Sequence, residues 1–170
     1  MQRTNFSDIA CPIARGLERV GEWWSIMILR DAFHGLARFD QFQKSLGIAP
    51  NMLTRRLNTL VESGLLKRRQ YEERPPRSEY VLTERGRDFL PEMISLMDWA
   101  NRHFAPDGVV SQVVDARTHQ PVEPMLVDKG SLRPLTEEDF KFAAGPAADE
   151  GACRRMAYSD RQRAKRGLVA

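Results

Sequence analysis

The sequence has little cysteine and no long hydrophobic run. Its two cysteines, Cys11 and Cys153, stand far apart in the chain and offer no disulfide framework of the kind that small secreted domains use. No apolar stretch approaches the ~20 residues that a membrane-spanning helix needs. The N-terminus also lacks the basic and then apolar pattern of a signal peptide. We therefore expect a cytoplasmic protein that has no membrane partner.

The motifs of the common enzyme classes are missing as well. The sequence has no Gly-rich phosphate loop, no metal-ligand spacing and no grouping of Ser, His and Asp beyond chance. The histidines His34, His103 and His119 are isolated, and each is expected at the surface or in a loop. We expect no enzymatic activity, no cofactor and no metal.

What the sequence does contain is enough apolar side chain for a core and a mild excess of positive charge. Hydrophobic residues make up 42% of the 170 residues, a length that suits about one domain with appendages. The formal net charge of +3 permits an anionic partner without proving one. The basic residues gather in two places, residues 67–77 and residues 154–166.

The most informative stretch is residues 48–82, which begins with the pattern of a short helix. Pro50 suits a first helical position, and Gly64 follows the last periodic residue as a cap. One apolar stripe is formed by Leu53, Leu57, Leu60 and Val61. The polar residues that would read or approach bases are Asn51, Thr54, Arg55, Arg56 and Asn58. Arg and Asn side chains can make two-point contacts to guanine and adenine edges.

The second half of this stretch changes period. Residues 66–71 and 78–82 are strand-like, and the prolines of residues 72–77 are expected to prevent both helix and strand pairing there. A helix followed by a basic hairpin is typical of a winged helix-turn-helix, with the helix in the major groove and the hairpin beside it. Two alternatives remain open. The helix and hairpin could be an ordinary packed unit with solvated arginines, or a module that binds protein, which the acidic Glu72 and Glu73 favour.

Around this stretch we expect a mainly α fold with a small β-hairpin wing. Helices are predicted from Pro12 to Gly21, over residues 22–33 as the buried centre, over residues 38–46, and over residues 84–104 with a kink or break at Pro91. Residues 1–104 would form the winged-helix DNA-binding and dimerisation domain. Residues 105–170 would form a C-terminal extension, with a hairpin at about 109–127 and then a flexible, low-order basic tail whose end is either a helix or disordered. No internal repeat is evident.

The helix over residues 84–104 is apolar on more than one side. One side would pack its own domain, which leaves the other for a partner. The candidate interface residues on it are Phe89, Met93, Leu96, Met97 and Ala100. Alternatively, Met93 and Met97 only fill irregular gaps in the core.

Several separate motifs, in order and at matching spacings, resemble one known family. They are Cys11-Pro12, residues 20–29 (VGEWWSIMIL), Arg38-Phe39, residues 52–57 (MLTRRL), Gly64-Leu65, residues 75–80 (PPRSEY) and residues 82–86 (LTERG). Over residues 11–104 the chain resembles the HxlR family of winged-helix transcriptional regulators. The resemblance implies a homodimer, built through the helices at both ends of the domain, that binds a pseudo-palindromic operator. It adds Ile13 and Leu17 to the expected dimer interface.

The resemblance also assigns roles along the DNA. Residues 50–62 would be the recognition element and residues 67–79 the wing. The expected DNA contacts are Arg38, Asn51, Thr54, Arg55, Arg56, Asn58, Lys67, Arg68, Arg69, Arg74 and Arg77. We expect a sequence-specific regulator, and a repressor rather than an activator.

The chain departs from the family pattern in two respects. Ala49 stands where the family often has a Ser helix cap, so the recognition helix should begin less well capped. Many members also carry a cysteine-rich hairpin after the long helix. Here residues 109–132 contain Asp115, His119 and Asp128 but no cysteine, so a structural zinc site is not expected.

Two regulatory features remain hypotheses. In some relatives a cysteine that matches Cys11 senses electrophiles or oxidants, and a position just before a helix should lower the pKa of its thiol. Alternatively, Cys11 is an inert residue of the dimer interface. A small-molecule effector could bind near Trp24, Phe89 and Trp99, although these aromatics also suit the core.

Overall fold

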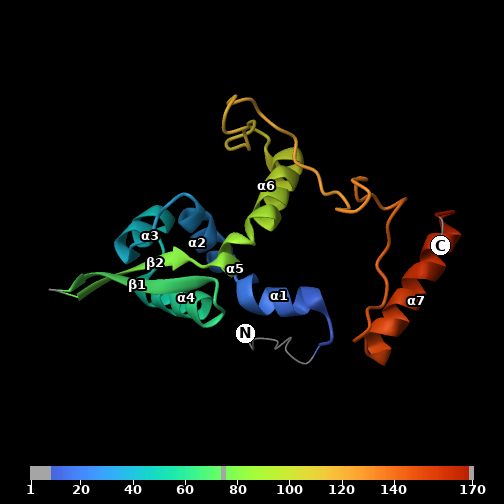
Figure 1. The fold of residues 1–170 in the computed structure, drawn as a ribbon, viewed down its shortest axis with the longest axis horizontal. Helices are drawn as coiled ribbons and strands as arrows, with labels where there is room; N and C mark the ends of the chain where they lie inside the picture. Colours follow the sequence, from blue (N-terminus) through green and yellow to red (C-terminus); the bar gives the residue numbers. More distant parts are fainter. Residues whose placement is uncertain (1–8, 74–75, 169–170) are drawn as a thin grey trace. The chain divides into compact units, whose positions relative to one another are not determined.

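The computed structural model describes residues 9–73 and 76–168. Over these residues the protein is mainly helical, with one two-stranded antiparallel sheet, as predicted (Figure 1). The chain divides into two compact units, one formed by Gly16–Glu123 and the other by Met1–Arg15 together with Pro124–Ala170. This division falls later in the chain than the expected boundary after residue 104, and it joins the start of the chain to its end.

The N-terminal helices begin and end close to their predicted positions. They are α1 (Pro12–Val20), α2 (Trp23–Phe33), α3 (Phe39–Leu46) and α4 (Pro50–Glu62). Gly47 ends α3 with a φ of 61°, a left-handed conformation that glycine adopts without strain. Gly47 at the end of α3 and Pro50 at the start of α4 therefore fix the limits of the helix-turn-helix.

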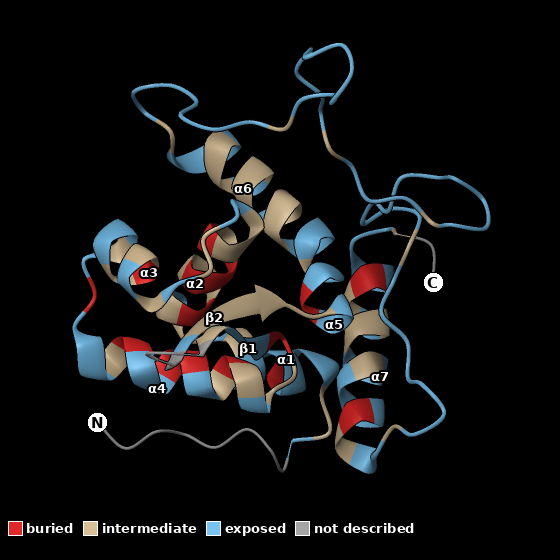
Figure 2. Ribbon diagram, turned by 60° about the vertical axis from the view of Figure 1, so that its left-hand side comes forward, coloured by how far each residue is buried: buried red, intermediate tan, exposed pale blue. Residues whose placement is uncertain are grey.

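The core of the winged helix lies where α2, α3 and α4 meet the base of the hairpin (Figure 2). Its buried members are Ile28, Leu29, Phe42, Ile48, Leu53, Leu57, Leu60, Leu65 and Leu66. Helix α2 is central, as predicted, but its first residue Trp23 is 74% exposed. Burial of apolar surface stabilises a fold by about 25 cal/mol for each Å2 removed from water. The packing of these side chains therefore holds α4 against the rest of the domain.

The wing consists of β1 (Leu66–Glu73) and β2 (Pro76–Leu82), which pair antiparallel from Leu66 opposite Leu82 to Glu73 opposite Pro76. The prediction that residues 72–77 cannot pair is therefore wrong outside Arg74 and Pro75, which lie beyond the described residues. Pro76 is the first residue of its strand, a place where a missing N–H interrupts no ladder. An isolated bridge between Arg38 and Glu79 adds a short third segment to the sheet.

The helix predicted over residues 84–104 is broken in two, as the position of Pro91 indicated. It forms α5 (Glu84–Arg87) and α6 (Leu90–Phe104), with Pro91 in the first turn of α6. The Thr83 hydroxyl caps α5 by accepting the backbone N–H of Gly86 at 3.0 Å. A Cβ at Gly86 would lie 2.1 Å from the carbonyl oxygen of Leu65, so this close approach requires glycine.

The C-terminal extension differs most from expectation. The hairpin predicted at about residues 109–127 is present only as a short antiparallel pairing: an isolated bridge joins Val114 and Pro121, and the N–H of Val122 donates to the carbonyl of Val113 at 3.1 Å. Of the two alternatives left open for the end of the tail, the structure has the helix: α7 (Glu150–Lys165) is capped by Asp149, whose carboxylate accepts the N–H of Ala152 at 2.7 Å.

The extension also contains an internal repeat, contrary to the expectation that the chain has none. A second bridge joins Val127 to Pro134, thirteen residues after the first. In each turn an aspartate accepts hydrogen bonds from the Thr or Ser three residues later in the chain. These bonds lower the pKa of both carboxyl groups. The main cause is the backbone N–H of Thr118 for Asp115 and the Ser131 hydroxyl for Asp128. The repeat is degenerate, VDARTHQPV against VDKGSLRPL, and so became visible only through its shared hydrogen bonds.

Candidate nucleic-acid interface

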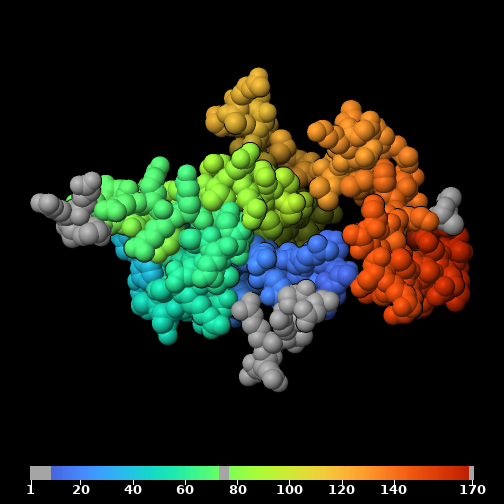
Figure 3. All heavy atoms as spheres, turned by 60° about the horizontal axis from the view of Figure 1, so that its bottom comes forward, coloured from blue at the N-terminus to red at the C-terminus, as the bar shows by residue number. Residues whose placement is uncertain are grey.

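Helix α4 separates its residues into a buried and an exposed face. Asn51, Thr54, Arg55 and Asn58 are all exposed and follow one another at i, i+3, i+4 and i+7. The hairpin lies beside this helix in the same unit (Figure 3). Four of the five predicted base-reading residues are therefore brought together on one accessible stripe.

The hydrogen bonds of these side chains leave most of their polar groups available. The Asn51 side-chain oxygen accepts the N–H of Met52 at 2.8 Å, and the Thr54 hydroxyl donates to the carbonyl of Pro50 at 2.9 Å. Within the described chain, the Arg55 and Asn58 side chains make no hydrogen bond or ion pair. Arg55 and Asn58 are thus free to make the two-point contacts that guanine and adenine edges accept.

Arg56 does not belong to this surface, which corrects the prediction that it approaches bases. Arg56 is only 3% exposed, and its guanidinium lies 3.3 Å from a carboxylate oxygen of Glu22 at the start of α2. It stands at i+3 from Leu53, so helical spacing already placed it on the buried stripe. Because Arg56 is charged and follows Arg55, it was assigned to the DNA-binding surface despite this spacing. Its ion pair with Glu22 was not predicted.

The start of α4 is weakly capped, as the departure at Ala49 predicted. Ala49 is the N-cap residue, in an extended conformation, and has no side chain to accept a first-turn N–H. Pro50 follows as the first helical residue and removes one of the unpaired donors.

The basic residues of the wing fall into two groups. Lys67 and Arg68 are exposed and make no ion pair within the described residues. Arg69 is bound by Glu79 directly across the sheet at 2.5 Å, and Arg77 lies 3.3 Å from Glu72. The predicted contact Arg74 lies outside the described residues. Among the described residues of the wing, the basic side chains that make no ion pair are therefore Lys67 and Arg68.

Arg38 connects the helix-turn-helix to the wing. Its backbone bridges to Glu79 and its N–H donates to the side chain of Gln41 at 2.9 Å, while its own side chain is exposed. Tyr71, 44% exposed on β1, was not among the predicted contacts. A phenol at that place can donate to a phosphate, and the position of Tyr71 in the predicted wing could have indicated this contact.

Cys11 precedes α1 directly, and its side chain is partly exposed. The backbone N–H of Ala14 lowers the pKa of this thiol; the N–H of Ile13 and the charges of Arg155 and Arg15 lower it further, against a raising effect of partial burial. The predicted direction is confirmed. The guanidinium of Arg155, which comes from α7, also donates to the carbonyl of Ala10 at 3.4 Å.

The helices expected in a dimer interface present apolar side chains to solvent. None of the residues of α6, all of them described, is buried; Leu96 is 44% and Trp99 48% exposed. On α1, Ile13 is 66% and Leu17 48% exposed. Met97 and Ala100 are partly exposed on the same helix as Leu96.

Two of the expected interface residues serve the domain's own core. Phe89 and Met93 are partly buried and pack against the buried cluster, so they hold α6 to the domain. Trp24 packs there too, which favours the core over an effector pocket for Trp24 and Phe89. Trp99 instead contacts Phe104, with ring centroids 5.0 Å apart.

Among the described residues, no helix combines the length and the apolar character needed to cross a bilayer. Within the same residues, no three His, Cys, Asp or Glu side chains are grouped so that they could hold a metal ion. Asp115 and Asp128 instead accept hydrogen bonds in their turns.

Comparisons with known proteins agree with this geometry. A profile described as HxlR-like helix-turn-helix matches residues 19–108. The uncharacterized HTH-type transcriptional regulator Rv3095 of Mycobacterium tuberculosis is 40% identical over 135 residues, 79% of this chain and 85% of that protein. The solved structure of PA1607, assigned as a transcription factor, is 39% identical with a TM-score of 0.75 and covers 84% of this chain and 100% of its own.

A third relative is the redox regulator HypR in its oxidised form, which is 31% identical with a TM-score of 0.51. The match covers 55% of this chain and 97% of HypR. The predicted fold and family are confirmed: the chain belongs to the HxlR-like helix-turn-helix family and is a DNA-binding transcriptional regulator with a winged helix.

Proposed function

We propose that the protein is a repressor that binds a pseudo-palindromic operator as a homodimer. The observation that carries the proposal is the exposed stripe of α4, with unpaired Arg55 and Asn58, beside a wing whose Lys67 and Arg68 are also unpaired within the described chain. The stripe would read base edges in the major groove, and the wing cations would bind phosphates. Asn51 and Thr54 would approach neighbouring bases, and Arg38 would reach the backbone from the start of α3. A repressor of this kind would bind chromosomal DNA, which agrees with the expected cytoplasmic location.

The operator can be found by selecting bound fragments of genomic DNA and footprinting them. We expect protected half-sites about one or two helical turns apart, as two-fold symmetry requires. Arg55→Ala should relax base preference at one position of each half-site, while Lys67→Ala should weaken all sequences alike. Transcription from the operator in vitro should fall when the protein is added. Absence of any selected sequence would instead favour a protein-binding winged helix.

Dimerisation would use the exposed apolar residues of α6 and α1. Leu96, Met97 and Ala100, with Trp99, offer apolar surface on α6, and Ile13 and Leu17 offer it on α1. Unpartnered apolar surface of this kind marks interaction sites.

The test of the dimer is sedimentation of a Leu96→Glu variant, with Arg102→Gln on the exposed surface of α6 as its control. The first should sediment as a monomer and lose operator affinity, and the control should remain dimeric. A monomeric wild-type protein that still binds the full operator would contradict the proposal.

Oxidation of Cys11 is the regulatory route that the structure supports best. The thiol is partly exposed, and the first turn of α1 lowers its pKa, which favours the reactive thiolate. HypR, a relative, is a redox regulator by its description. We expect an oxidant to lower operator affinity in the wild type and in Cys153→Ser, but not in Cys11→Ser. Unchanged affinity after both oxidation and alkylation of Cys11 would exclude this route.

A further inference from the structure

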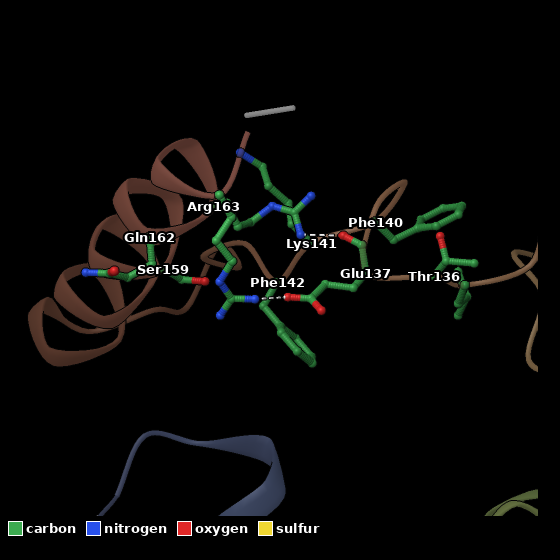
Figure 4. Close-up of a pocket in the computed structure, with 10 residues that line it drawn as sticks. Thr136, Glu137, Phe140, Lys141, Phe142, Ser159, Gln162 and Arg163 are labelled. Atoms are coloured by element: carbon green, nitrogen blue, oxygen red, sulfur yellow. Dashed lines mark hydrogen bonds and ion pairs between the residues drawn. The ribbon is translucent and has the colours of Figure 1, made fainter. Parts of the chain in front are cut away.

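The unit formed by Met1–Arg15 and Pro124–Ala170 contains a pocket of about 610 Å3 between α7 and the segment before it (Figure 4). Ligand pockets in proteins measure about 300–1,000 Å3, so the volume suits a small organic molecule. Leu135, Phe140 and Phe142 supply apolar lining, and Lys141, Arg163 and Arg166 supply positive charge. None of these residues belongs to the DNA-reading surface or to the expected dimer helices.

The cations of the pocket differ in how firmly they are held. Arg163 is 7% exposed and donates to the backbone carbonyls of Glu137 at 2.5 Å and Glu138 at 3.3 Å, so it fixes the segment against α7. Arg166 pairs with the carboxylate of Glu137, and Lys141 with Asp160 at 3.0 Å. These two pairs are solvent-exposed, and exposed pairs contribute only about 0–1 kcal/mol. An incoming anion can therefore replace either carboxylate.

Glu137 shows what such an anion would look like. Both dashed contacts in Figure 4 end on this residue, and its side chain brings a carboxylate to the Arg166 guanidinium at the pocket. The lining carries three cations against one carboxylate, and Asp160 outside the lining pairs with Lys141, so one positive charge remains in excess when both carboxylates are counted. Phe142 is 78% exposed, so its ring is accessible to the apolar part of a ligand. The pocket thus has a charged side suited to a carboxylate and an apolar side suited to a hydrocarbon or aromatic body.

We propose that this pocket binds a small organic acid with an apolar or aromatic body. Its carboxylate takes the place of the Glu137 side chain beside Arg166 and Lys141, and its body covers Phe142 and Leu135. A simple inorganic anion would leave these apolar groups exposed, and a neutral aromatic would leave the cations to their present partners. That such an acid acts as an effector of DNA binding rests on the proposed function, whereas its binding does not.

The binding test is calorimetric titration of the full chain with benzoate, phenylacetate, 3-phenylpropionate and octanoate. Acetate and 2-phenylethanol serve as probes that lack the apolar body or the charge. We expect at least one of the four acids to bind in the micromolar to millimolar range, and both control probes to bind at least about tenfold more weakly. No binding of any acid up to millimolar concentration would overturn the proposal, as would equal binding of acetate or 2-phenylethanol.

Variants locate the site on the folded protein. Arg166→Gln and Phe142→Ser change exposed side chains, so both should fold, and each should weaken the acid that binds by about tenfold, the usual value of a charge-assisted or a buried apolar contact. Lys165→Gln removes a neighbouring cation of α7 that does not line the pocket and should change nothing. Equal weakening by Lys165→Gln would reduce the binding to general attraction by a basic helix and refute the site.

The effector role has its own readout. Operator affinity measured with and without the acid should differ in the wild type and should not differ in Arg166→Gln. Binding without any change in operator affinity would keep the pocket and exclude the regulatory role. Loss of operator binding in the absence of any acid would count against the proposed function alone.

Discussion

Replacing Arg56 by alanine should destabilise the protein, whereas replacing its neighbour Arg55 should weaken DNA binding. The two arginines are adjacent in the sequence, but Arg56 lies on the buried side of α4 and Arg55 on its exposed side. The Arg56 side chain is 4% exposed and sits 3.3 Å from Glu22, whose side chain is 35% exposed. Arg55 is exposed and has no partner in the described chain.

The size of the effect follows from this geometry. Removing one member of a fully buried ion pair costs about 3–5 kcal/mol, because the other charge is left without compensation. Glu22 is only partly buried, so water can solvate it again and this cost is smaller. The packing of the Arg56 stem is lost in addition. We expect the free energy of unfolding to fall by about 2–3 kcal/mol in Arg56→Ala and by less than about 0.5 kcal/mol in Arg55→Ala.

A third variant separates packing from charge. Arg56→Met keeps an apolar stem of similar length and removes a guanidinium whose Nε and Nη1 atoms have no hydrogen-bond partner among the described residues. Arg56→Met still leaves the partly exposed Glu22 without this partner but keeps the packing of the stem, so its free energy of unfolding should fall by about 1–2 kcal/mol, less than in Arg56→Ala. Urea unfolding followed by circular dichroism measures all three variants.

Operator binding by the folded variants completes the test. Arg55→Ala should lose about 1–3 kcal/mol of binding free energy at its preferred base, and Arg56→Met should lose little. If Arg56→Ala unfolded like the wild type and yet lost base preference, the assignment of the two faces of α4 would be wrong.

Three further expectations concern the wing, the helix cap and the thiol. Arg68→Ala should reduce the slope of log affinity against log salt by about 0.9 per phosphate contact, and Arg69→Ala by less because Glu79 already neutralises it; equal reductions in salt titrations would contradict this. Ala49→Ser should raise the free energy of unfolding in urea by about 0.5–1 kcal/mol, since its hydroxyl can accept a first-turn N–H, and no gain would mean that the cap is already satisfied. In a Cys153→Ser background, alkylation of Cys11 should reach half its maximal rate at a lower pH than alkylation of free cysteine, whose thiol pKa is about 8.5, and a midpoint at or above that of free cysteine would argue against a stabilised thiolate.

The sequence was sufficient wherever the structure depends on local signals. Pro50, Gly47 and Pro91 act on the backbone within one or two residues, so the helix-turn-helix and the break before α6 could be placed from them. The exposed stripe of α4 was also predictable, because helical spacing assigns faces without knowledge of the rest of the fold.

The residues that were misplaced depend on partners remote in the sequence. Helical spacing within α4 places Arg56 on the buried stripe, but it cannot supply the partner that compensates its charge, which is Glu22 at the start of another helix. Arg69 loses its free charge to Glu79 only through the register of the hairpin. Both cases show that counting basic residues overestimates a DNA-binding surface, since acidic partners on neighbouring elements neutralise or bury part of it.

The extension after α6 distinguishes two kinds of relative. HypR matches little more than the winged-helix part, whereas PA1607 also matches much of the chain beyond residue 108, where the family profile ends. A property that resides in the winged helix can therefore be compared with HypR, but a property of α7 and its pocket cannot. Cys11 lies directly before α1 and in the same compact unit as α7, and Arg155 of α7 helps to lower the pKa of its thiol. If the extension tunes the thiol in this way, Arg155→Gln should slow alkylation of Cys11 at neutral pH, and an unchanged rate would mean that the first turn of α1 alone sets its reactivity.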